Sequence, residues 1–341
     1  MTHRFPIKEI ALQSGLSTAT VDRVLNGRAH VSAQTKARVA AALSELEGQE
    51  AQLSARGRRM FVDVVVEAPK RFSSEVRAAL EAELPGLGPA VLRPRFAFGE
   101  EMSEPVMVAH LDRILKRGSQ GVLLKARDLP GVRRQLRRFN QRGIPVVTLV
   151  TDLPGAARLG YVGLDNSQAG QVAAYLIAGA LKGQAGSVLM TKSQHSFFGE
   201  VEREAAFARE LENRAPGLRL IDASGGAGLN RSTRETVQAA LRGVSDLKGV
   251  YSMGGGNGAI LQEIAATGQV AEVFVAHDLD RDNRQLLRAE RLSYVLHHDL
   301  RRDLRQGFQQ IMGFHGLMPD PGSSGLSEIQ VLTPLNMSGK A

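Results

Sequence analysis

The pattern of apolar and polar positions divides the chain into two parts. In the first fifty residues, apolar side chains recur three and four positions apart, which is the spacing of one face of an α-helix. Three short helices are predicted: the first ends at Gly15, the second runs from a Ser17 cap to Asn26, and the third runs from a Ser32 cap to Gly48.

From Phe61 the pattern changes to short β-branched runs separated by amphipathic stretches of about a dozen residues, which predicts βαβ units and parallel sheets. The runs are 61–67, 121–126, 144–150, 160–165, 186–192, 218–223, 249–253, 272–278 and 292–299. The clearest amphipathic stretches are 104–117, 131–142, 166–182, 198–214 and 230–242. About ten strands are too many for one sheet, so two doubly wound α/β lobes are expected behind the all-α headpiece.

Composition is that of a water-soluble protein with more than one domain: 341 residues, 43% hydrophobic and 23% charged. No apolar run reaches the ~18 residues of a membrane span, and the N-terminus lacks the apolar core of a signal peptide. The chain has no Cys, which excludes disulfides, thiolate metal sites and Cys nucleophiles. A cytoplasmic protein is expected.

Charge is unevenly distributed along the chain. The net charge is +8, and residues 1–60 hold nine Lys and Arg against five Asp and Glu, which is half of that excess. A basic segment favours an acidic partner, so these residues are interpreted as a nucleic-acid-binding module.

The second predicted helix directs Thr18, Ala19, Asp22 and Arg23 outward, close to its N-terminal end. Short side chains let a helix approach the floor of the DNA major groove, and the donor fork of Arg23 matches O6 and N7 of guanine. Thr20 and the first backbone amides suit a phosphate. The same pattern also fits an ordinary three-helix bundle with a solvated second helix.

The segment IKEIALQSGLSTATVDRVLNGRAHVSAQTKARVAAALSEL resembles the helix-turn-helix headpiece of the lac repressor family of transcriptional regulators. The match is gap-free over about forty residues. The residues that carry it are Glu9-Ile10-Ala11, Gly15-Leu16-Ser17, Thr20-Val21, Arg23-Val24-Leu25-Asn26-Gly27 and Val31-Ser32.

This resemblance implies roles for the headpiece side chains. Thr18, Ala19 and Arg23 would face bases. The residues placed nearer the phosphates are Ser17, Thr20, Asn26, His30 and Ser32. Asp22 departs from the family's common Ser, and a carboxylate there would repel phosphate or accept a hydrogen bond from a cytosine amine.

Residues 49–60 are polar and basic and are interpreted as a hinge or linker. Family members usually carry a Pro-Asn hinge helix whose Leu wedges into the minor groove. Here the stretch is shorter and lacks that pair, so Leu53 is the one wedge candidate, and Arg56, Arg58 and Arg59 would add phosphate contacts. A disordered basic tether is the alternative.

The resemblance continues over 61–341 to the type I periplasmic sugar-binding-protein fold, and it implies a division of the chain. The headpiece is 1–48, the linker 49–60, and the effector and dimerisation domain 61–341. Its N-lobe would comprise about 61–165 plus about 299–320, and its C-lobe about 166–292 plus the C-terminal segment.

A polyol or sugar ligand requires Asp, Asn and Arg side chains at strand ends between the lobes. Arg203 lies in GEVEREAAF, which is similar to the family's Arg-x-x-Gly-Phe ligand motif with Ala206 in place of Gly, and His298 stands where relatives often have Gln. Each residue alone would also fit a helix cap or a surface position. The full candidate set is Phe72, Arg127, Asp152, Arg203, Asn257, Asp278 and His298.

One feature mimics enzyme chemistry. Gly254, Gly256 and Ala259 follow a strand in a G-x-G-x-x-A spacing, so a nicotinamide-dependent oxidoreductase is an alternative, as is a solute-binding protein of a transport system. His297 and His298 are adjacent on a strand and point to opposite faces, so no metal site is expected there.

The sequence favours a repressor that is not an enzyme and needs no cofactor. It would act as a homodimer on a pseudopalindromic operator and respond to a sugar or polyol.

Overall fold

A computed structural model of the chain describes residues 4–28, 31–55, 57–319 and 325–337, with side chains of 51–55 excepted. The headpiece comprises α1 (Ile7–Ser14), α2 (Thr18–Leu25) and α3 (Ala33–Ala55). Gly15 ends α1 with a left-handed φ of 61°, and the Ser17 hydroxyl accepts the Thr20 N–H at 3.2 Å at the start of α2. Both predicted helix ends are therefore confirmed.

The three helices of the headpiece pack around a small core of its own. Ile10, Val21 and Val39, one from each helix, are at most 1% exposed. Arg38 of α3 donates to the Ser14 carbonyl at 2.7 Å, which fixes the turn between α1 and α2. This packing holds α2 in a defined orientation.

The prediction that the third helix ends at Gly48 is wrong, because α3 continues to Ala55 through the first half of the predicted linker. A mid-helix Gly costs only about 1 kcal/mol relative to Ala, and the sequence QEAQLSA that follows it consists mainly of good helix formers. Strand β1 then begins at Arg59.

Two sheets follow, and their parallel strands have the same doubly wound order, which confirms the predicted α/β fold. The N-lobe sheet is, in spatial order, β2 (Val91–Gly99), β1 (Arg59–Glu67), β3 (Gly121–Lys125), β4 (Val146–Leu149) and β5 (Gly160–Val162). The C-lobe sheet is β7 (Leu218–Asp222), β6 (Gly186–Thr191), β8 (Leu247–Ser252), β9 (Val273–His277), β10 (Tyr294–His297) and the antiparallel β11 (Gln330–Leu332).

The sequence pattern missed two edge strands. β2 carries Pro94 and two Arg residues and is only partly buried, as an edge strand can be, and β11 is three residues long. Neither gives the apolar run by which the buried strands were found.

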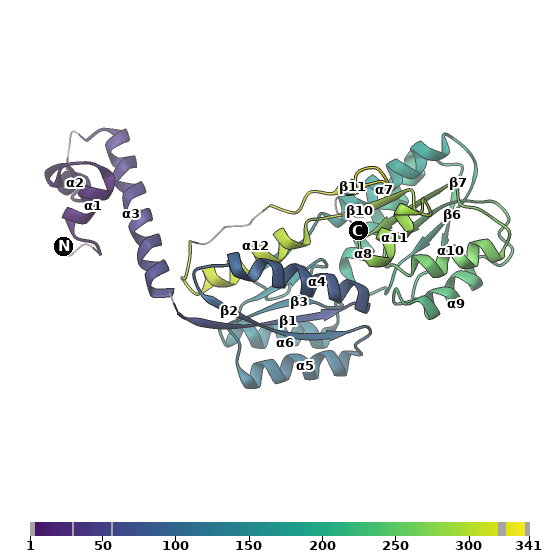
Figure 1. Cartoon of the computed structure of the whole chain (residues 1–341), viewed down its shortest axis with the longest axis horizontal. Coiled ribbons are helices and arrows are strands. Elements are labelled where there is room, and N and C mark those ends of the chain that lie inside the picture. Colours follow the sequence, from purple (N-terminus) through teal and green to yellow (C-terminus); the bar gives the residue numbers. More distant parts are fainter. Residues whose placement is uncertain (1–3, 29–30, 56, 320–324, 338–341) are drawn as a thin grey trace.

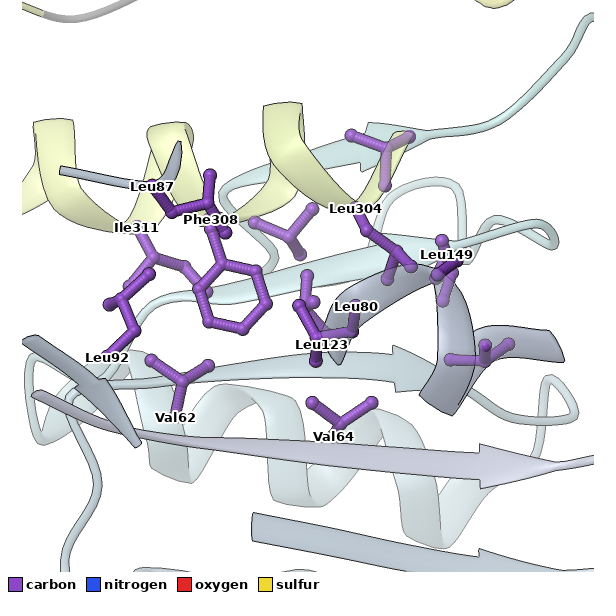
Figure 2. Packing of buried hydrophobic residues seen from close by; sticks show 14 of the residues in the cluster. Val62, Val64, Leu80, Leu87, Leu92, Leu123, Leu149, Leu304, Phe308 and Ile311 are labelled. Carbon is purple, nitrogen blue, oxygen red and sulfur yellow. The ribbon is translucent and has the colours of Figure 1, made fainter. Parts of the chain in front are cut away.

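The helices cover both faces of each sheet, and none described is long and apolar enough to cross a membrane. Their bounds are α4 (Lys70–Glu83), η1 (Leu84–Gly86), α5 (Glu104–Arg117), α6 (Pro130–Gln141), α7 (Asn166–Leu181), α8 (Phe198–Arg214), α9 (Asn230–Ala240), α10 (Asn257–Ala266), α11 (Arg281–Arg288) and α12 (Leu300–Phe314). α12 returns to the N-lobe, where Phe308 and Ile311 pack on Val62 and Leu123 (Figure 2). α5 and α6 cover the opposite face of that sheet (Figure 1).

Candidate functional sites

The outer face of α2 is the first candidate site. Ser17, Thr18, Ala19 and Arg23 are exposed, whereas Val21 on the opposite side is fully buried. The Ser17 and Thr20 hydroxyls lie 2.8 Å apart at the N-terminus of the helix. The headpiece core therefore presents the predicted base-facing side chains together on one surface, with a helix N-terminus suited to phosphate beside them.

Asp22, the departure from the family pattern, has its partners inside the headpiece. Its Oδ1 accepts from Asn26 Nδ2 at 2.8 Å, and its Oδ2 lies 3.4 Å from an Arg28 guanidinium nitrogen. These contacts orient Asn26 and Arg28 at the end of α2. They also neutralise much of the repulsion that a free carboxylate would exert on a DNA phosphate.

Three further candidates follow α2 in the sequence. Ser32 is exposed and its hydroxyl accepts the Thr35 N–H at 3.1 Å, so it caps α3. His30 lies outside the described residues. Leu53 lies in the helical backbone of α3, but its side chain is also outside the described part.

The second candidate site is a pocket between the lobes, at the carboxyl ends of their parallel strands. Glu67 and Lys125 end β1 and β3 of the N-lobe, and Asp278 follows β9 of the C-lobe. Phe72 and Phe197 supply aromatic surface. The other charged wall residues are Arg71, Glu100, Glu200, Arg203 and Asp280.

The lobes contact each other around this pocket. Arg71 of the N-lobe pairs with Asp280 of the C-lobe at 2.8 Å and donates to the Gly228 carbonyl at 2.8 Å. At a second contact between the lobes, the Gly199 N–H donates to the Thr151 hydroxyl at 3.0 Å. A molecule held in the pocket would therefore contact both lobes.

The glycines at 254–256 have a steric function in this contact. A Cβ on Gly254 would lie 2.3 Å from the backbone nitrogen of Ser193, and one on Gly255 would lie 2.1 Å from the Arg71 guanidinium. Gly255 also has a φ of +88°. Close packing, within the C-lobe at Gly254 and between the lobes at Gly255, thus accounts for these glycines without a dinucleotide.

Lys125 provides a cation on the pocket wall. Its Nζ lies 4.0 Å from the centre of the Phe197 ring and donates to the Glu67 carbonyl at 2.9 Å. Burial lowers the pKa of Lys125, while the charges of Glu200, Glu67 and Asp278 act to raise it. The cation is thus held between an aromatic face and carboxylates.

Arg203 and Asp278 are oriented by neighbours behind the wall. Arg203 faces inward from α8, and its Nε donates to Asn166 Oδ1 at 2.7 Å. Asp278 has a left-handed φ of 62°, and its Oδ1 lies 3.6 Å from Nε2 of the buried His298. The His298 Nδ1 is hydrogen-bonded to Asp303 of α12, so a His ring connects a pocket carboxylate with the N-lobe.

The family models match in two adjoining parts: "Bacterial regulatory proteins, lacI family" over residues 6–47 and "Periplasmic binding protein domain" over 64–301. The chain belongs to the lacI family of bacterial regulatory proteins. The HTH-type transcriptional regulator TreR of Salmonella typhimurium is 32% identical over 131 residues, which cover 36% of this chain and 39% of TreR. The match thus spans about two fifths of that relative.

Solved structures share the fold of this lacI-family chain. A glucose-galactose binding protein from Geobacillus stearothermophilus superposes with a TM-score of 0.73 at 16% identity, covering 83% of this chain and 99% of that one. A putative LacI transcriptional regulator from Bacteroides fragilis gives 0.71 at 12% identity, with 82% and 98% covered. A solute-binding protein from Burkholderia graminis, in complex with D-arabinose, gives 0.72 at 19% identity, with 84% and 98% covered.

The structure of this lacI-family protein brings Phe72, Arg203 and Asp278 together on the pocket wall. The other candidates lie elsewhere. Asp152 forms a two-pronged ion pair with Arg158, which keeps the pKa of its carboxyl low although burial acts to raise it.

The remaining candidates are also engaged outside the wall. Asn257 donates to Asn283 Oδ1 at 2.6 Å, and Arg127 pairs with Glu67 at 2.9 Å behind the strand ends. His298 stands behind Asp278. None of these three lines the pocket, and each contacts another side chain instead.

Several wall residues were missed from the sequence. Glu67 and Lys125 could have been found, because each is a charged residue that ends an otherwise apolar strand. Glu200 lies three residues before Arg203 on the same face of α8. Arg71 and Phe197 gave no signal, since only the tertiary fold places them at the pocket.

His298 gives a pH prediction. Burial opposes its protonation, but the hydrogen bond and charge of Asp303, with the charge of Asp278, raise the pKa of His298 overall; Arg203 acts to lower it. Because the pKa is higher in the folded state, protonation of His298 stabilises the fold. This stabilisation is complete when the pH is below the unfolded pKa near 6.5, and it is lost as the pH rises through the folded pKa.

We therefore expect the free energy of unfolding of wild type to be higher than that of His298→Gln. The difference should be largest at low pH and should shrink above about pH 6.5. Urea unfolding of both proteins over a pH series measures it. Subtracting the variant cancels the part of the His277 and His297 contributions that comes from burial, which lowers both pKa values; the part that comes from the charge of His298 stays in the difference. A difference that grows with pH would contradict the prediction.

Proposed function

We propose that this protein is a transcriptional repressor whose affinity for its operator is changed by a polyhydroxylated ligand, a sugar or polyol, bound between the lobes. One observation carries the proposal: the same chain contains an exposed α2 face and a pocket lined by residues of both lobes. Phe72 and Phe197 suit the apolar face of a sugar ring, and Asp278 and Arg203 suit its hydroxyls.

The mechanism we propose is thermodynamic linkage. Arg71 and Asp280 join the lobes beside the pocket, so a ligand that contacts both lobes favours one lobe orientation over another. In a homodimer, that orientation sets the spacing of two headpieces relative to a pseudopalindromic operator. The ligand is bound and released unchanged, so the protein is not an enzyme, and it acts in the cytoplasm.

Support for the proposed class of ligand comes from the distribution of charge in the pocket. The pocket groups of opposite sign are close together, with Lys125 among Glu67, Glu200 and Asp278. With five carboxylates and three cations, the wall offers both acceptors and donors, and its formal net charge is −2. It suits a neutral molecule with many hydroxyls better than a strongly ionic one.

A thermal-shift screen of the full chain against aldoses, polyols, sugar acids and amino acids tests the ligand class. A ligand present at 100 times its Kd stabilises the fold by about 2.7 kcal/mol, which is a shift of several degrees. We expect a neutral polyhydroxylated compound to give the largest shift and to change operator affinity in a gel-shift assay. A shift caused by amino acids alone would refute the sugar assignment.

A further inference from the structure

Positive charge is concentrated in a second part of the chain, outside the headpiece. Residues 104–142 contain ten Lys and Arg against three Asp and Glu, a surplus of seven where the whole chain has +8. α5 and α6 carry most of these cations on their exposed faces. The pocket uses only Lys125 among them, so the surplus needs another explanation.

Topology brings these cations to one edge of the N-lobe. Because the helices run back against the parallel strands, the C-terminal turns of α5 and α6 lie where the strands begin. Contacts agree with this placement: Arg95 of β2 donates to the Gly118 carbonyl after α5 at 3.3 Å, and Arg142 after α6 donates to the Leu115 carbonyl at 3.2 Å. Strand starts add further cations to the same edge. Six exposed residues at this edge are together named the basic rim: Arg58, Arg59, Arg93, Arg113, Arg137 and Arg142.

The basic rim is not neutralised by carboxylates. Within the described part of the chain, no salt bridge is recorded for its six members, whereas their neighbours Lys116 and Arg138 share Asp112, and Arg117 pairs with Asp63. The nearby acids of α4 are engaged elsewhere, Glu81 by Arg77 and Glu83 by Arg305.

Helix dipoles do not explain the rim. Cations are favoured in the last turn of a helix, which would account for Arg137 and Arg142. Arg58, Arg59 and Arg93 lie at strand starts, where no such dipole acts. Six like charges at one edge repel each other, so an external anion is the simplest stabilising partner.

The headpiece emerges from this edge of the N-lobe. Residues 56–58 separate α3 from β1, and three residues span at most about 11 Å. Figure 1 shows α3 leading from α1 and α2 to the start of β1, so this edge of the lobe faces the headpiece.

We propose that the basic rim binds the phosphate backbone of DNA flanking the operator, as a contact surface separate from α2. The inference rests on the proposed function as a DNA-binding regulator. The rim reads no sequence; it adds affinity and salt dependence. It would partly replace the hinge-helix contact whose Pro-Asn pattern the linker lacks.

The test uses the full chain and an operator selected from random duplexes. Two probes are compared, the operator alone and the operator with about 15 flanking base pairs on each side, over a salt titration. The variant is Arg113→Gln, Arg137→Gln and Arg142→Gln together. The matched control removes three exposed C-lobe cations by Arg209→Gln, Arg242→Gln and Arg291→Gln.

Wild type and the control should bind the long probe more tightly than the short one, with a steeper dependence of log affinity on log salt. Each lost phosphate contact lowers that slope by about 0.9, so the rim variant should lose up to about 3 in slope for each protomer, or about 5 for the homodimer, on the long probe and almost nothing on the short one. A rim variant that matches wild type on both probes would overturn the proposal and assign the surface to another acidic partner. If wild type bound the short probe without sequence selectivity, the proposed function would fail, and the rim proposal with it.

Discussion

Asp278→Asn is expected to shift the response of operator binding to a higher ligand concentration while leaving ligand-free operator binding intact. The carboxylate stands on the pocket wall directly after β9, and the side chain is 22% exposed. Asn tolerates the left-handed φ of 62°, so the substitution changes charge with little backbone strain. A hydrogen bond to a charged group contributes about 1.5–3 kcal/mol, so ligand affinity should fall roughly ten- to hundred-fold.

Calorimetry with the ligand identified by thermal shift measures the loss, and a gel-shift assay measures operator binding. Asp282→Asn is the matched control, because it removes the same charge from a half-exposed position in the first turn of α11, outside the pocket wall. Unchanged ligand affinity in Asp278→Asn would remove Asp278 from the site. Loss of ligand-free operator binding would show that the residue acts on the fold instead.

Arg23→Ala should relax operator specificity at one base pair, where discrimination of about 1–3 kcal/mol is lost. Arg23 is exposed on α2, and in the described residues no salt bridge is recorded for it. Val21 and the other core positions of the headpiece are untouched by the change, so α2 should keep its orientation.

The measurement is binding to a set of operators that differ by single base pairs. Arg4→Ala serves as the control, since Arg4 has the same charge but pairs with Glu47 and Glu50 away from α2. The control should preserve the ranking of the operators. A uniform weakening by Arg23→Ala across all operators would mean that Arg23 contacts phosphate and reads no base.

Local chemistry explains why the headpiece was predictable. Gly15 adopts the left-handed cap that its position suggested, and Ser17 accepts the amide of Thr20, because caps depend on neighbours within four residues. Gly48 is the exception. Its helix continues because good helix formers follow it, and residue type alone did not decide between a cap and a tolerated interior Gly.

The ligand site was predictable only as far as strand ends show it. The apolar runs located the strand ends that Asp152 and Asp278 follow. Only Asp278 lines the pocket, however, because Asp152 is engaged in an ion pair. Asp152 is occupied by Arg158, a contact set by the loop conformation between β4 and β5. Arg71 reaches the pocket only through the packing of one lobe on the other, which no local pattern encodes.

The most direct test of ligand-controlled DNA binding is selection of operators from random duplexes with the full chain, followed by titration with and without the ligand. We expect one pseudopalindromic sequence to bind at least a thousand-fold more tightly than random DNA at physiological salt, roughly the lower limit for specific binding, and the ligand to change that affinity. Equal affinity for the selected and random duplexes, or an operator affinity that the ligand leaves unchanged, would contradict ligand-controlled DNA binding.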